Sequence, residues 1–94
     1  MEKKINTERE LGRAAAELAE EVAPIYELLK WEWQSEGVPD KYQIFDKIIE
    51  LYDDLDEHKT SYVSSGGLTA SIEQDEEKEY VKLSFSIEKI FYTE

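Results

Sequence analysis

Residues 7–35 read TERELGRAAAELAEEVAPIYELLKWEWQS and carry the longest periodic pattern in the chain. Their apolar residues recur at steps of four and three, which places them on one side of a helix. Thr7 and Glu10 have the spacing of a capping box, so the helix is expected to begin there, or one residue earlier if Asn6 is the cap. The stripe consists of Leu11, Ala15, Leu18, Val22, Ile25 and Leu29. The stretch predicts a long amphipathic helix on which the rest of the chain packs.

Pro24 lies within this pattern and disfavours a straight helix, although the spacing of the apolar residues continues through it unchanged. Its ring removes one intrahelical hydrogen bond and presses on the preceding turn, which predicts a kink. The alternative is two helices, 7–22 and 24–35, with Pro24 in the first turn of the second. We favour a single kinked helix because the apolar stripe continues through Pro24.

Trp31 and Trp33 fall at the end of this predicted helix. Two residues apart on a helix, they would point about 200° away from each other, so they are not expected to share one core layer. One would pack on a second helix and the other on a sheet. The alternative is an exposed aromatic anchor for a partner, because tryptophan is enriched at binding hot spots.

A second helix is predicted over residues 39–57. Gly37 suits the left-handed position after a helix, and Pro39 suits the first turn of the next one. A connection this short predicts an antiparallel helical hairpin. The inward face is expected to consist of Tyr42, Phe45, Ile48, Ile49, Tyr52 and Leu55.

From residue 60 the apolar residues alternate with polar ones, which is typical of strands. The clearest runs are 68–73 and 81–87, separated by a charged loop; Tyr62-Val63 is too short to assign. Residues 60–92 therefore predict a β-meander or hairpin, and residues 1–6 only a frayed lead-in. The fold expected for residues 1–94 is one α+β domain. It has a helical hairpin packed on a C-terminal two- or three-stranded antiparallel sheet.

The charge of the chain restricts its partners. The 94 residues carry a net charge of −12, and segments 1–36, 37–59 and 60–94 each contribute −4. A uniformly acidic body repels nucleic acid and anionic membranes and attracts basic surfaces. There is no cysteine, no apolar run of bilayer length and no leader pattern behind Met1. A cytoplasmic protein with a basic protein partner is expected, without nucleic-acid or membrane binding.

No catalytic or metal-binding pattern stands out. The tract DDLDEH at residues 53–58 lacks the glycine and the distant glutamate of a calcium loop, and His58 is the only histidine. The tract SSGG at residues 64–67 precedes a strand, whereas a phosphate loop precedes a helix. No nucleophile with an orienting base can be identified. We therefore expect neither an enzyme nor a cofactor or metal site.

The second predicted helix carries acidic residues at steps of three and four: Asp46, Glu50, Asp53 and Glu57. Their spacing along the axis, about 4.5–6 Å, is comparable to that of charges along a DNA strand. Glu10, Glu17 and Glu21 would form a second row on the first helix. Small acidic αβ inhibitors of nucleases and CRISPR effectors, encoded by viruses or mobile elements, resemble this chain in composition.

Two hypotheses of function follow. The first is a DNA-mimicking inhibitor that occupies a basic surface through the four acidic residues. The second is an interaction module, such as a homodimer held together through Trp31 or Trp33, or an acidic immunity protein. Solvated faces of two amphipathic helices would produce the same acidic rows.

Overall fold

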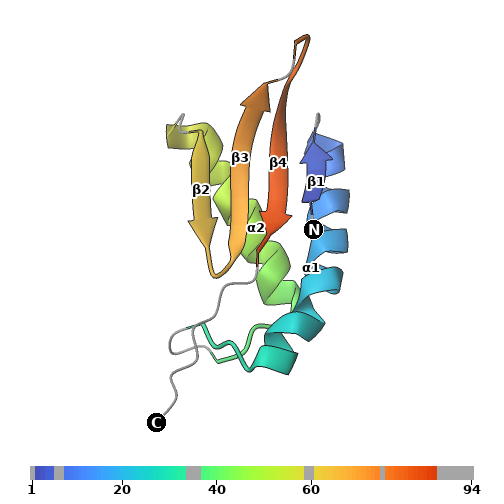
Figure 1. Cartoon of the computed structure of the whole chain (residues 1–94), viewed down its shortest axis with the longest axis vertical. Coiled ribbons are helices and arrows are strands. Elements are labelled where there is room, and N and C mark those ends of the chain that lie inside the picture. Colours follow the sequence, from blue (N-terminus) through green and yellow to red (C-terminus); the bar gives the residue numbers. More distant parts are fainter. Residues whose placement is uncertain (1, 6–7, 34–36, 59–60, 75, 87–94) are drawn as a thin grey trace.

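The computed structural model describes residues 2–5, 8–33, 37–58, 61–74 and 76–86. Within these ranges the chain forms two helices and four strands (Figure 1). In chain order they are β1 (Glu2–Ile5), α1 (Glu8–Leu29), α2 (Lys41–His58), β2 (Tyr62–Ser65), β3 (Leu68–Gln74) and β4 (Glu79–Phe85). The α+β class predicted from the sequence is confirmed.

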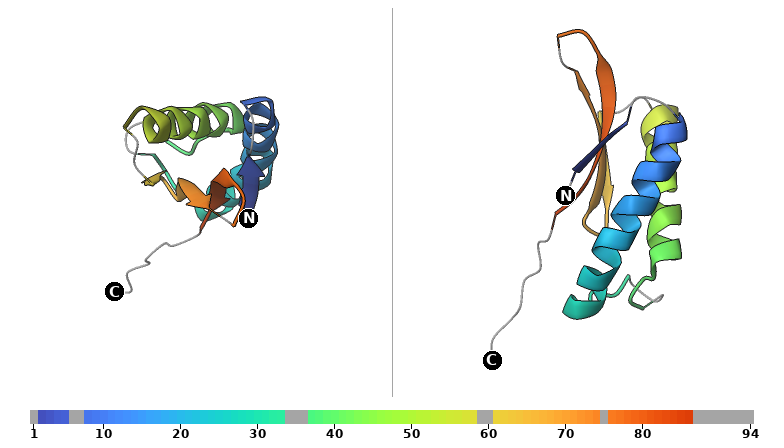
Figure 2. Two further views of the ribbon diagram at one scale, coloured as in Figure 1. Left: turned by 90° about the horizontal axis from the view of Figure 1, so that it is seen from above. Right: turned by 90° about the vertical axis from the view of Figure 1, so that its right-hand side faces the viewer.

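The four strands form one antiparallel sheet in the order β1-β4-β3-β2. Ala70 in β3 lies between Val63 of β2 and Leu83 of β4, so these side chains share one face of the sheet. Both helices cover this face (Figure 2), α1 contacting β1 and β4 and α2 contacting β2 and β3. In Figure 1, α1 runs downwards from the end near β1, and α2 runs back upwards. The core is therefore a single layer between helices and sheet.

The sheet has four strands and not the predicted two or three, because Glu2–Ile5, in the predicted frayed lead-in, form the strand β1. Its sequence, EKKI, offers a single apolar residue and no alternation to recognise. Ile5 is nevertheless 2% exposed, opposite Val81 in the register of β1 and β4. Pairing with β4 is a contact distant in sequence that local periodicity does not predict.

The first helix continues through Pro24, so the two-helix alternative is wrong, while the kink stays a prediction. The helix ends at Leu29, short of the predicted residue 35. Lys30 adopts a left-handed conformation with φ of 51°, and its amide donates to Glu27 O at 3.1 Å. The amide of Trp31 donates to Tyr26 O at 3.0 Å. This pair of bonds is a Schellman motif, which ends the helix even though no glycine occupies the left-handed position.

The second helix begins at Lys41, one residue after Asp40, which is the N-cap residue of a capping box. Asp40 Oδ1 accepts from the amides of Tyr42 at 3.0 Å and Gln43 at 2.9 Å, and Gln43 Oε1 accepts from the amide of Asp40 at 2.9 Å. The predicted start at Pro39 is thus replaced by a cap at Asp40.

The inward face of α2 also differs from the prediction. Its buried stripe is Ile44, Ile48, Leu51 and Leu55, whereas Tyr42 is 70% exposed. Phe45, Ile49 and Tyr52 are half-buried and flank the core. Helix periodicity alone allows two overlapping apolar stripes on α2. The prediction follows the stripe that contains the aromatic residues, whereas the buried stripe is the aliphatic one.

Candidate protein-binding surface

An aromatic cluster closes the end of the core where α1 stops. Tyr26 is fully buried, and its ring centroid lies 5.4 Å from Trp31, 5.5 Å from Trp33 and 5.2 Å from Phe85. Both tryptophans therefore face the same cluster, contrary to the prediction that they point apart. The reason is that α1 ends at Leu29, so helical geometry does not apply to Trp31 and Trp33.

Polar contacts within the cluster join the helix to the sheet. The Tyr26 hydroxyl donates to the carbonyl oxygen of Gly66, in the turn between β2 and β3. Burial raises the pKa of Tyr26 to about 12, an effect that the adjacent Trp33 indole partly opposes. Among the residues that the structure describes, the buried Trp33 Nε1 nevertheless has no acceptor in hydrogen-bond geometry. At neutral pH Tyr26 is a neutral hydrogen-bond donor.

Trp31 and Trp33 are half-buried against the core. The Lys47 ammonium lies 5.9 Å from the centroid of the Trp33 ring, so α2 covers part of this ring as well. Their binding of a partner stays a prediction. Most of their apolar surface already serves to hold the segment after α1 against the sheet.

The four acidic residues predicted on the second helix are all exposed. Asp46, Glu50, Asp53 and Glu57 lie on the side of α2 opposite the buried stripe. We call them the α2 acidic strip. Glu50 pairs with Lys47 at 3.3 Å, an exposed ion pair that removes little of the strip's charge from solvent.

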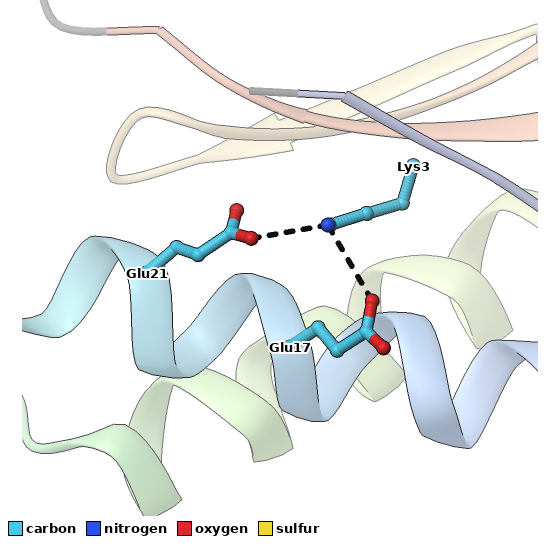
Figure 3. Close-up of polar contacts among 3 residues, drawn as sticks. All are labelled: Lys3, Glu17 and Glu21. Carbon is cyan, nitrogen blue, oxygen red and sulfur yellow. Dashed lines mark hydrogen bonds and ion pairs between the residues drawn. The ribbon is translucent and has the colours of Figure 1, made fainter.

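The acidic row predicted on the first helix is arranged differently. Lys3 of β1 places its Nζ 3.4 Å from Glu17 Oε2 and 3.1 Å from Glu21 Oε1 (Figure 3). Hydrogen bonding to Glu21 is the main cause that raises the pKa of Lys3 above its ordinary value. Glu17 and Glu21 therefore serve to hold β1 on α1, and only part of their charge is left for a partner.

A groove between the two helices was not anticipated from the sequence. One hollow, with a volume of about 310 Å³, is lined by Ala16, Ala19, Glu20, Lys41, Tyr42 and Phe45. A second hollow of about 580 Å³ shares Glu20 and Lys41 and extends along Ala23, Pro24, Glu27, Val38, Pro39 and Asp40. We call the two together the interhelical groove. Small alanine side chains facing aromatic ones were the signal for it in the sequence.

Within the ranges that the structure describes, no group of three or more histidine or acidic side chains is placed to hold a metal ion. His58 is the last residue of α2. In the same ranges, neither helix has the length and apolar character needed to cross a membrane.

Comparisons with protein-family models, with curated proteins and with solved structures found no match to this chain.

Proposed function

We propose that the protein is a non-catalytic inhibitor that binds the basic, nucleic-acid-binding surface of a target protein through the α2 acidic strip. The observation that supports this proposal is the exposure of all four carboxylates on a single side of one helix. Successive members are about 4.5–6 Å apart along the axis, similar to the spacing of phosphate charges along a DNA strand. Such a surface attracts the lysine and arginine side chains that ordinarily contact phosphates.

The arrangement of the basic residues adds to this support. Lys3 is engaged by Glu17 and Glu21, on the side of α1 that carries β1. Lys82 pairs with Glu73 at 3.4 Å on the sheet. Along the strip, Lys47 pairs with Glu50, and in the described part of the chain the four carboxylates of the strip outnumber this one ammonium group. A basic target would therefore meet more carboxylates, which attract it, than ammonium groups, which repel it.

The experiment is a capture of proteins from bacterial lysate on the immobilised protein and on the variant with Glu50→Lys and Asp53→Lys in parallel. The control variant, Glu76→Lys with Glu79→Lys, makes the same charge change at exposed positions outside α2. Each captured protein is then purified and tested for release of labelled DNA when the protein is added.

The expected result is a nucleic-acid-binding target that the parent and the control retain and the α2 variant loses. The target should elute as salt rises, because exposed charge pairs are screened. It should also release its DNA in proportion to the inhibitor added. Equal retention by the α2 variant, or a target that keeps its DNA when saturated, would contradict the proposal.

A further inference from the structure

The interhelical groove has the dimensions of a docking site for a helical segment. Its wall on α1 extends from Ala16 to Glu27, about 16 Å along the axis at the helical rise per residue. This corresponds to about three turns of a second helix. The groove lies on the outer side of the helix pair, beside Asp46, which follows Tyr42 by one turn of α2. A segment bound there would contact the α2 acidic strip at its edge.

The groove is apolar inside. Ala16, Ala19 and Ala23 leave space that Phe45 and Tyr42 border from α2. Tyr42 is 70% exposed and Val38 is 37% exposed, although both carry large apolar surfaces. Burying such surfaces under a partner's leucine or isoleucine side chains is favourable.

The rim of the groove is acidic. Glu20 and Glu27 are exposed and make no ion pair within the part of the chain that the structure describes. They are two turns apart on the same side of α1, about 10 Å along the axis. Asp40 adds a carboxylate, although it also caps α2. Lys41 is the one basic residue among the described lining residues, and its ammonium lies 5.3 Å from the centroid of the Tyr42 ring.

We propose that the groove binds an amphipathic basic helix of the target, with apolar side chains in the groove and lysine or arginine two turns apart on Glu20 and Glu27. This inference rests on the proposed function and adds to it the chemistry of the recognised segment. Helices bind in apolar grooves of this kind through side chains at i, i+3, i+4 and i+7. A second copy of the chain is a poorer occupant, because each copy carries a net charge of −12 and would bring further carboxylates to this rim.

The test uses the full chain and a fluorescent peptide of about 15 residues, enough for four helical turns, that places leucine on one face and lysine on the other. A scrambled peptide of the same composition has the same charge and no apolar face. Binding is followed by fluorescence anisotropy at two salt concentrations. Circular dichroism confirms that each protein variant is folded.

Two kinds of variant separate the apolar and the charged parts of the site. Ala16→Trp fills the groove from an exposed position of α1, and Tyr42→Ala removes its wall. Glu20→Gln with Glu27→Gln neutralises the rim. Glu76→Gln with Glu79→Gln is the matched control, with the same loss of charge at exposed positions in and next to β4.

The expected result is that the parent prefers the amphipathic peptide over the scrambled one. Ala16→Trp should weaken its binding by about tenfold or more, and Tyr42→Ala should weaken it as well. The Glu20 and Glu27 variant should bind more weakly and with less dependence on salt than the control variant. Equal binding of both peptides, or unchanged binding to Ala16→Trp and Tyr42→Ala, would overturn the inference.

The two proposals fail in different ways. If the groove variants bind the amphipathic peptide normally while the Glu50→Lys, Asp53→Lys variant loses the captured target, the groove inference is wrong and the proposed function stands. If the groove variants lose the peptide while the Glu50→Lys, Asp53→Lys variant keeps the target, the groove binds basic helices. The hypothesis that the α2 acidic strip binds the target is then wrong.

Discussion

The hydroxyl of Tyr26, near the end of α1, donates a hydrogen bond to the carbonyl oxygen of Gly66 in the turn between β2 and β3. The bond links the long helix to the hairpin farthest from it in the sheet order. Replacing Tyr26 by phenylalanine should lower the free energy of unfolding by about 1–3 kcal/mol, because a part-buried carbonyl oxygen loses its donor. Urea denaturation of both proteins measures this difference.

The matched control for that prediction is Tyr42→Phe. It deletes the same hydroxyl from a side chain that is 70% exposed, and the free energy of unfolding should change by only a few tenths of a kcal/mol. Equal effects of the two substitutions would show that the Tyr26 bond contributes nothing specific.

The same tyrosine should make stability depend on alkaline pH. Burial raises its pKa from 10.0 to about 12 in the folded protein, so the unfolded chain loses this proton first as pH rises. The contribution of the protonated phenol is fully present below pH 10 and is lost between about pH 10 and pH 12. Across this window the parent should lose about 1–2 kcal/mol more unfolding free energy than Tyr26→Phe. Parallel curves for the two proteins, from denaturation at each pH, would argue against a raised pKa.

The turn at Gly66 should tolerate no side chain. Its φ is +60°, and a Cβ atom there would lie 2.5 Å from Trp33 Nε1 and 3.0 Å from Trp33 Cε2. Gly66→Ala should therefore destabilise the protein by about 2 kcal/mol or more, through backbone strain and displacement of the indole.

Gly12→Ala provides the opposite expectation. Gly12 lies inside α1, and nothing would come within 4 Å of an added Cβ. Alanine there should stabilise the protein by about 0.5–1 kcal/mol because it favours the helix. Thermal unfolding of the Gly66→Ala and Gly12→Ala variants tests both predictions. A Gly66→Ala variant as stable as the parent would contradict the packing of Trp33 on the turn at Gly66.

The end of α1 suggests a stabilising substitution. Lys30 occupies the left-handed position of the Schellman motif with φ of 51°, where a residue with a Cβ is strained. Lys30→Gly should raise the free energy of unfolding by about 0.5–1 kcal/mol. Lys30→Ala is the control, since it removes the charge but keeps the Cβ. Stabilisation by both variants to the same extent would assign the effect to charge and not to backbone conformation.

Periodicity was sufficient to predict the two helices and the β3 and β4 strands, because each buries one regular face. It failed where tertiary contacts decide the structure. The residues EKKI gain their strand conformation from β4, with Ile5 in the core and Lys3 on α1. The left-handed turn at Lys30 has no sequence signature, since glycine is the residue expected there.

Only part of the candidate site could likewise be predicted from the sequence. Exposure of Asp46, Glu50, Asp53 and Glu57 could be predicted, because helix spacing places them on the other side of the helix from Ile48 and Leu55. The alanines of α1 and the aromatic residues of α2 point to the interhelical groove, but its width could not be predicted, because it depends on how closely α2 approaches α1. Trp31 and Trp33 could not be placed either, since their positions depend on where α1 ends.

The bridge from Lys3 to Glu17 and Glu21 should hold β1 on α1 through charge. Lys3→Gln is expected to destabilise the protein, and the effect should shrink as salt screens the pair. Hydrogen bonding raises the pKa of Lys3, so the stabilisation is fully present below pH 10.5 and is lost as pH rises through the raised value. A double-mutant cycle with Glu17→Gln and Glu21→Gln isolates the interaction, because in that background Lys3→Gln should have little effect. If Lys3→Gln destabilises both backgrounds equally, the lysine acts through packing of its aliphatic stem and not through the ion pairs.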